Sequence, residues 1–220
     1  MQKPKMTTKY ITVVAMFCAV SFISVLIAKV IPNVAGFLSY EPKDAVIVIA
    51  GFIMGPDASA IIALIVSFIE MISISTTGPI GFLMNVLASC AFAVPAAWLY
   101  KTNRSYKDAI VGLVLCLVLM TVCMLLWNYI ITPMYMGVER EVVAGMLAGV
   151  FLPFNLIKGG INAGLALLLY KPIVGALRKA KLVEPSTGGQ KGKFSLGGTV
   201  FALVVLATFV LLFLVLAGVI

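Results

Sequence analysis

Long apolar stretches without a charged residue dominate this chain, and they constrain its fold more than any other feature. The first of them, residues 10–28, contains 19 residues without a charge, about the length that a helix needs to cross the hydrocarbon core of a bilayer. Apolar residues make up 62% of the chain and charged residues 11%, against about 45–50% and about 25% in soluble proteins. A soluble protein of this size could not bury so much apolar surface. The sequence therefore predicts an all-α integral membrane protein.

Turns rich in Pro, Gly and charge separate the apolar stretches and predict seven helices. The basic start of the chain resembles a signal peptide, but the apolar stretch after it is longer than a signal core, so we expect a retained helix. We expect a six-helix membrane core within residues 1–181, a polar linker over 182–198 and an additional transmembrane helix over 199–220. The expected core helices cover residues 10–31, 42–55, 58–75, 79–100, 108–132 and 145–179, the last of them interrupted near Pro153.

The second expected helix, residues 42–55, is too short to span a bilayer. Its 14 residues would reach about 21 Å, well short of a hydrocarbon core of about 30 Å. A segment with Pro32 and Gly36 precedes it, and non-helical backbone at membrane depth must be buried in protein or line a cavity. Short or broken segments of this kind indicate transporter binding sites.

The cationic residues are distributed unevenly between the two sides. Twelve of the sixteen Lys and Arg residues lie before residue 10, within 101–107 or after residue 170, three lie in the alternate loops, and Lys158 lies within a helix. The positive-inside rule then predicts a multi-pass protein of the cell membrane with a cytoplasmic N-terminus. Charges confined to membrane loops also argue against a nucleic-acid partner.

Two charged residues stand inside apolar helices, where an unpaired charge is costly and usually faces a partner or a water-filled cavity. Lys158 indicates a substrate contact, with a structural ion pair or snorkelling as the alternative. Glu70 is a second candidate, although it also fits an interfacial position near the outer end of its helix.

Asn155 lies three residues before Lys158, so the two side chains share one face of a helix. The ammonium donates hydrogen bonds, whereas the amide both donates and accepts. Together they could hold a planar ligand with carbonyl and imide edges, and Phe154 could add a stacking surface.

Asp44 and Asn85 complete the candidate substrate-binding residues. Asp44 lies in the first turn of the short helix, where it could also interact with the helix dipole. Asn85 could bond across helices or line the cavity, and Glu41 and Lys43 fit either a solvated loop or the same site.

Several classes of chemistry lack the residues they need. The chain has no histidine, and its four cysteines lie in apolar stretches without CxxC spacing, so we expect neither a metal site nor a cofactor. The sequence has no phosphate-binding loop of the GxxxxGK[ST] type. We therefore expect no enzymatic activity, and a partner must supply the energy for any ATP-driven transport.

Three stretches of the chain, residues 37–44, 51–56 and 154–159, resemble the S component, the substrate-binding subunit, of energy-coupling factor (ECF) vitamin transporters. The riboflavin-specific type is the most similar, and the resemblance covers about residues 8–180. It implies a six-helix core with an extracellular site that is capped by the loop between the first two helices. It also implies that Asn155 and Lys158 contact the flavin ring.

The resemblance implies partners as well. These are riboflavin or a related flavin as the transported ligand, and an energy-coupling module of one coupling membrane subunit and two ATPase subunits. Ala15 and Ala19 match the small-residue motif that docks on the coupling subunit, with ordinary packing of the first helix as the alternative. The additional C-terminal helix has no counterpart in the six-helix core. An S component for another vitamin, a secondary transporter, a membrane enzyme and a structural subunit remain alternatives.

Overall fold

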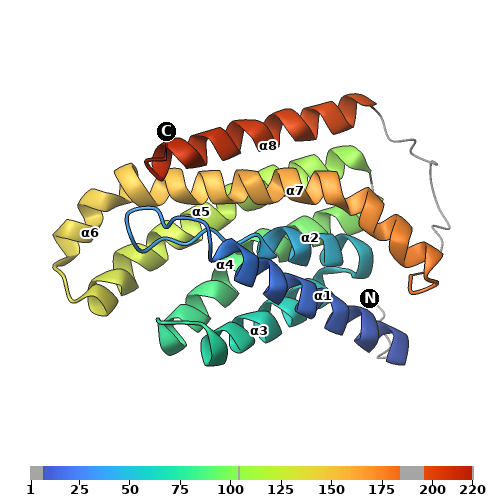
Figure 1. Ribbon diagram of the computed structural model, residues 1–220, viewed down its shortest axis with the longest axis horizontal. Coiled ribbons are helices and arrows are strands. Elements are labelled where there is room, and N and C mark those ends of the chain that lie inside the picture. Colours follow the sequence, from blue (N-terminus) through green and yellow to red (C-terminus); the bar gives the residue numbers. More distant parts are fainter. Residues whose placement is uncertain (1–6, 104, 184–195, 220) are drawn as a thin grey trace.

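The computed structural model describes residues 7–103, 105–183 and 196–219, and these residues form helices and loops. Figure 1 shows an elongated helical bundle in which α8 lies along the outside of α7. The all-α fold predicted from the sequence is confirmed. In chain order the elements are α1 (Thr8–Ala28), α2 (Lys43–Met54), α3 (Pro56–Ser73), α4 (Gly78–Asn103), α5 (Tyr106–Met136), α6 (Arg140–Met146), the π-helical turn η1 (Leu147–Phe151), α7 (Leu152–Lys179) and α8 (Leu196–Leu216).

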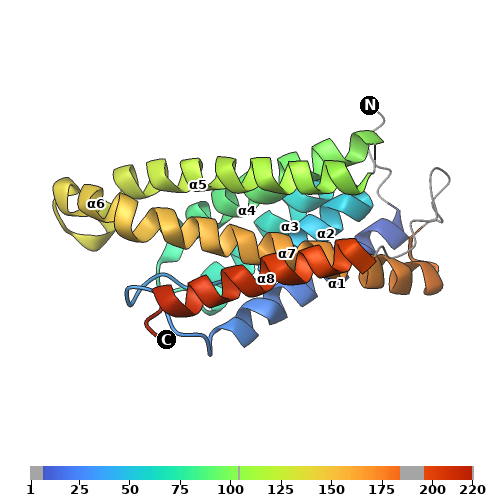
Figure 2. The same ribbon diagram turned by 90° about the horizontal axis from the view of Figure 1, so that it is seen from above.

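Six helical stretches among the described residues are long and apolar enough to cross a membrane. They are α1, α3, α4, α5, the continuous stretch from α6 through α7, and α8. The short helix α2 has only 12 residues and completes a six-helix core with the first five of these stretches. Figure 2 shows α8 against α7, outside this core.

The short helix α2 lies in the middle of the bundle and packs against α1, α3, α4 and α7. Its central residues Ile47, Val48 and Ile49 are fully buried. At Gly51, a Cβ would come within 2.7 Å of the Ala97 Cβ on α4, so only glycine permits this close approach. The next turn depends on Gly55, whose φ of 105° is accessible mainly to glycine. α2 is thus a buried half-length helix, as its length in the sequence predicts.

Several helix boundaries differ from the sequence-based expectation. The helix expected over 10–31 ends at Ala28, and the helical stretch expected over 145–179 already begins at Arg140. The helix expected over 108–132 begins at Tyr106 after a Ser105 cap, and it continues past Pro133 to Met136. Proline removes one backbone donor, but a membrane helix can tolerate this loss when the freed groups find other partners. The helix ends at Gly137, which adopts a left-handed conformation. The interruption expected near Pro153 corresponds to the π-helical turn η1, directly before α7.

α8 packs closely on α7 through two glycines. A Cβ at Gly160 would come within 2.5 Å of the Phe209 ring, and one at Gly164 would lie 3.2 Å from the Leu206 Cα. Most of the expected linker, residues 184–195, lies outside the described residues. The division into core, linker and additional helix stays a prediction.

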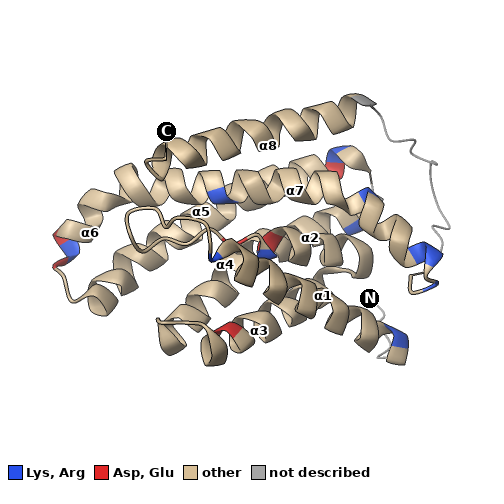
Figure 3. Cartoon of the chain, viewed as in Figure 1, with Lys and Arg blue, Asp and Glu red and all other residues tan. Residues whose placement is uncertain are grey.

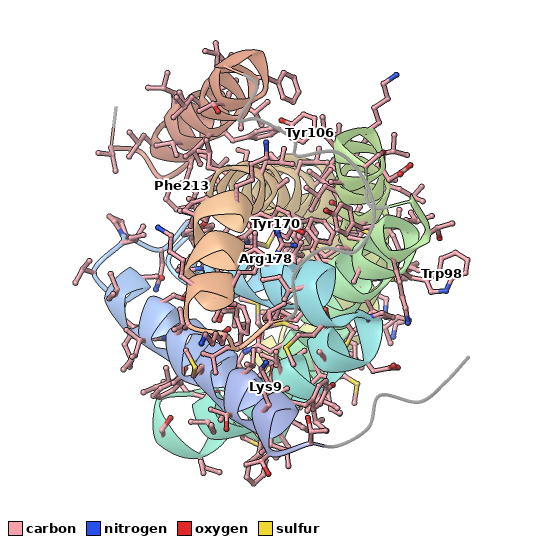
Figure 4. All side chains as sticks on the ribbon, turned by 90° about the vertical axis from the view of Figure 1, so that its right-hand side faces the viewer. Lys9, Trp98, Tyr106, Tyr170, Arg178 and Phe213 are labelled. Carbon is pink, nitrogen blue, oxygen red and sulfur yellow. The ribbon has the colours of Figure 1, made fainter. Side chains whose placement is uncertain are left out.

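Charged residues lie at one end of the molecule, beside α2 and, in smaller number, at α6 at the opposite end (Figure 3). Figure 4 looks onto that end, where Lys9 and Arg178 are labelled and Trp98 projects outward from α4. The described cations of this end are Lys9, Lys101, Lys107, Lys171, Arg178, Lys179 and Lys181. The large apolar residues that face outward on α1, α5 and α8 suit contact with lipid rather than with water.

Candidate functional site

Five charged side chains meet at the N-terminal end of α2. Lys43 Nζ lies 2.6 Å from Glu70 Oε2 and 3.2 Å from Glu41 Oε2. Lys158 Nζ lies 3.1 Å from the same Glu41 oxygen and 3.8 Å from Asp44 Oδ2. Glu41 therefore bridges two lysines that come from different helices, α2 and α7. The cluster joins α2, α3, α7 and the α1–α2 segment (residues 29–42).

Helix α4 supplies two neutral partners for the carboxylates of the cluster. Asn85 Nδ2 donates to Glu70 Oε2 at 2.9 Å, and Ser89 Oγ donates to Asp44 Oδ1. The second Glu70 oxygen, Oε1, is buried and has no hydrogen-bond partner among the described residues. A buried acceptor without a partner is costly, so this atom is available to a donor from a ligand.

The end of the α1–α2 segment is fixed to α7 by Asn162. Its Nδ2 donates to the Glu41 backbone oxygen at 3.1 Å, and its Oδ1 accepts from the Tyr40 hydroxyl at 3.3 Å. Burial raises the pKa of the Glu41 carboxyl, but the charges of Lys43 and Lys158 more than offset this effect and hold the pKa at about 2. Glu41 is therefore ionised at neutral pH and stays paired with both lysines.

A cavity of about 150 Å³ opens beside the charged cluster. The α1–α2 segment, α3, α4, α5 and α7 all contribute to its walls. One part of the lining is polar and the other is apolar. The polar part includes Glu41, Glu70, Asn85, Asn128, Asn155 and Lys158, and the apolar part includes Phe37, Leu38, Met84, Ala88, Met124 and Phe154.

Five of the six predicted substrate-binding residues line this one cavity, although the sequence places them on three different helices. They are Glu70, Asn85, Phe154, Asn155 and Lys158. The sixth, Asp44, lies behind the cavity wall and is buried near the Lys158 ammonium. The roles of these residues in substrate binding stay predictions.

The alternatives for Lys158 and Glu70 are partly decided by the structure. Lys158 forms an ion pair, which was one of its two alternatives to a substrate contact, and it also lines the cavity. Glu70 is only 3% exposed, so it does not occupy a solvated interfacial position. Asn155 Nδ2 donates to the Phe151 carbonyl at 2.8 Å, so the π-helical turn helps to orient this amide.

The predicted docking residues Ala15 and Ala19 are not among the residues that line the cavity. Both are exposed on α1, whereas Val14 and Cys18 on the same helix are buried against the bundle. The two alanines therefore lie on the side of α1 that faces away from the bundle. Their role in docking stays a prediction.

Lys43 and Glu41 are the site residues that sequence reasoning left undecided. The Lys43 side chain is 1% exposed, which excludes a solvated loop for this residue. One signal could have singled it out: Glu70 stands in an apolar helix and needs a cation. Among the cations near the outer helix ends, Lys43 lies two residues before the apolar stretch that starts at Ala45.

The sequence profile of the ECF transporter substrate-specific component matches residues 9–170. The chain belongs to this family. Its members are transporter components, so the chain is a transport protein of the membrane, with several spanning helices, and not an enzyme.

Individual relatives agree with the family assignment. Riboflavin transporter RibU of Staphylococcus aureus (strain TCH60) is 28% identical in an alignment of 178 residues that covers 78% of this chain and 93% of that protein. Riboflavin transporter FmnP of Bacillus subtilis (strain 168) is 32% identical in an alignment of 168 residues that covers 70% of this chain and 86% of that protein. The solved S component of a bacterial ECF transporter superposes with a TM-score of 0.66 at 29% identity, covering 77% of this chain and 98% of that one.

Proposed function

We propose that this ECF S component binds riboflavin at high affinity and serves as the substrate-binding subunit of an ATP-driven importer. The observation that carries the proposal is a cavity with one polar and one apolar wall, in a chain whose relatives are named riboflavin transporters. A flat ring system with polar substituents suits such a lining, because most of a ligand's surface is buried against apolar groups while a few polar groups fix its orientation.

The polar wall offers complementary groups for such a ligand. Lys158 can donate to a carbonyl oxygen, and the unpartnered Glu70 Oε1 can accept from a hydroxyl or an imide N–H. Phe154 and Phe37 can pack on the faces of the ring. Asn155 lies one helical turn before Lys158 and borders the same wall.

The α1–α2 segment is the part of the wall that must move when the ligand binds. The cavity of about 150 Å³ is smaller than the roughly 300–1,000 Å³ of ordinary small-molecule sites. Phe37, Leu38 and Ser39 of this segment line it, and so do residues 74–77 of the short α3–α4 turn, whereas the remaining walls belong to packed helices. We expect the segment to shift outward as the ligand enters and to cover it afterwards.

The test is equilibrium binding of riboflavin to the purified protein, followed by quenching of flavin fluorescence. Lys158→Ala and Asn155→Ala are measured beside Lys179→Ala, which removes an exposed lysine from the far end of the same helix. We expect tight binding that the first two variants weaken at least tenfold and the third leaves unchanged. Absence of riboflavin binding by folded wild-type protein would overturn the riboflavin assignment.

The energy for uptake would come from a module of one coupling membrane subunit and two ATPase subunits, docked on α1 at Ala15 and Ala19. We expect Ala15→Leu and Ala19→Leu to abolish riboflavin uptake in cells while leaving riboflavin binding by the purified protein intact. Ala176→Leu, an equal change at an exposed position near the end of α7, is the control. Full uptake by the α1 variants would exclude this docking surface.

A further inference from the structure

The C-terminal helix α8 contacts the α1–α2 segment, which covers the cavity. It lies outside residues 9–170, the part of the chain that matches the family. Its middle is anchored on α7, where the Phe209 ring covers Gly160 and the Leu206 backbone covers Gly164. Because Lys158 is on the same helix as these glycines, α8 packs directly on the helix that carries part of the candidate site.

One turn beyond this anchor, Phe213 reaches the α1–α2 segment. Its ring lies 5.7 Å from the Tyr40 ring, centroid to centroid, with an interplanar angle of 60°. Figure 4 shows Phe213 on the side of α8 that faces the bundle, and it is only 5% exposed. The two rings belong to one buried apolar cluster together with Val34, Phe154, Ile157 and Ile161.

Tyr40 connects this aromatic pair to the charged cluster. Its hydroxyl donates to Asn162 Oδ1, and Asn162 Nδ2 donates to the backbone oxygen of Glu41, the next residue. The Glu41 side chain in turn lines the cavity and pairs with Lys158. The position of Glu41 is therefore held from α7 by Asn162, and the preceding residue is covered by Phe213 of α8.

We propose that Phe213 is a positioning residue for substrate binding: it holds Tyr40, and with it Glu41 and the α1–α2 segment, in the closed arrangement over the cavity. α8 then acts as a built-in clamp that slows opening of the segment and so slows dissociation of the ligand. The effect on the ligand rests on the proposed riboflavin function, whereas the effect on opening of the segment does not.

The first measurement therefore uses no ligand. Hydrogen exchange is followed at the amides of Val34 and Leu38, which bond to each other's carbonyl oxygens at 2.9 and 3.0 Å within the segment. Phe213→Ala in the full chain should speed exchange at both amides about 3- to 10-fold, the size expected for losing one aromatic pair. Phe201→Ala is the control, because it removes an aromatic ring of α8 that is 45% exposed. Phe213→Tyr, which keeps the ring, should restore slow exchange.

The second measurement is the riboflavin dissociation rate of the same variants. We expect Phe213→Ala to raise this rate about 3- to 10-fold and Phe201→Ala to leave it unchanged. Exchange in α3 and α4 should be the same in all variants, which separates a local effect from general loss of stability. If the wild type binds no riboflavin, the proposed function fails, but the exchange data still show whether α8 restrains opening of the α1–α2 segment. Two results would overturn the proposed role of Phe213. One is equal amide exchange at Val34 and Leu38 in Phe213→Ala and Phe201→Ala; the other is an acceleration in Phe213→Ala that is equally large throughout the bundle.

Discussion

At the scale of single residues, Lys43 and its partners show how a membrane protein can keep charge at its centre. The Lys43 ammonium lies between Glu70 and Glu41, and Lys158 supplies a second cation to Glu41. Removing one partner of such a buried group leaves the other charge uncompensated, which costs much more than the pair itself contributes. The cluster therefore holds α2, α3 and α7 in one arrangement around the cavity.

Replacing Lys43 by methionine tests this account. We expect Lys43→Met to lower the free energy of unfolding by about 3–5 kcal/mol, because Glu70 and Glu41 lose their shared cation. Lys179→Met, at an exposed position, should change it by less than about 0.5 kcal/mol. The double variant Lys43→Met/Glu70→Gln should recover at least about 1 kcal/mol, since it removes the stranded charge. Denaturant unfolding in detergent measures all three, and strict additivity in the double variant would contradict the pairing.

The pKa of Glu41 gives the cluster a defined pH range. In the folded protein this pKa is about 2, whereas an unfolded glutamate titrates near about 4.3. The ionised carboxylate therefore favours folding fully above pH of about 5, and this contribution disappears as the pH falls toward about 2. We expect the difference in thermal midpoint between wild type and Glu41→Gln to be constant from pH 8 to 5 and to shrink below pH 4. A difference that already shrinks between pH 8 and 6 would contradict the low pKa.

At the scale of elements, close helix packing depends on glycines that face a neighbouring helix. Gly51 lets α2 approach α4, and Gly160 and Gly164 let α8 approach α7. Gly175, on the same helix α7, has no atom within 4 Å of the position that an alanine Cβ would occupy, so a side chain there meets open space. The same residue type thus has opposite consequences along a single helix, according to what lies opposite.

The contrast between Gly160 and Gly175 can be measured with one kind of substitution. Gly160→Ala should destabilise the protein by about 1–3 kcal/mol, because the new methyl group would press against the Phe209 ring. Gly175→Ala should be neutral or stabilising by up to about 1 kcal/mol, because alanine is the better helix former. Thermal or denaturant unfolding of both variants in the same detergent is sufficient. Equal effects at the two positions would mean that α8 is not packed on α7 in solution.

At the scale of the whole molecule, the bundle is arranged for a bilayer and not for water. Its central helix α2 is buried on all sides, and large apolar side chains of α1, α5 and α8 face outward. Most described cations gather at one end (Figure 3). By the positive-inside rule this end would face the cytoplasm, and the cavity beside the α1–α2 segment would open to the outside.

Cysteine labelling in intact cells tests this orientation. In a cysteine-free background, Lys179→Cys at the basic end should be inaccessible to a thiol reagent that cannot cross the membrane, because we expect it to be cytoplasmic. Val138→Cys, in the turn between α5 and α6 at the opposite end, should react readily. Both positions are exposed, so a difference reports on sidedness and not on burial. The reverse pattern would contradict the expected topology.

The sequence by itself determined the membrane character, the approximate helices and the half-length of α2. These features follow from local properties: the length of an apolar stretch, its Pro and Gly boundaries, and the cost of an isolated charge such as Lys158 in lipid. It also indicated four polar residues, Glu70, Asn85, Asn155 and Lys158, that prove to line one cavity, because a polar group inside an apolar helix needs a partner or a cavity. Local patterns placed the end of α5 less well, since Pro133 breaks helices in water more readily than in a packed membrane bundle.

Only the tertiary structure decided which charges pair and what covers them. Lys43 meets Glu70 across 27 residues of sequence, and Lys158 meets Glu41 across 117. A charge in the sequence specifies that a partner is needed but not which one, because any opposite charge brought near by folding would serve. The contact of Phe213 with Tyr40 has the same origin: an apolar helix predicts burial or lipid, and only the packing of α8 against α7 brings the Phe213 ring onto the α1–α2 segment.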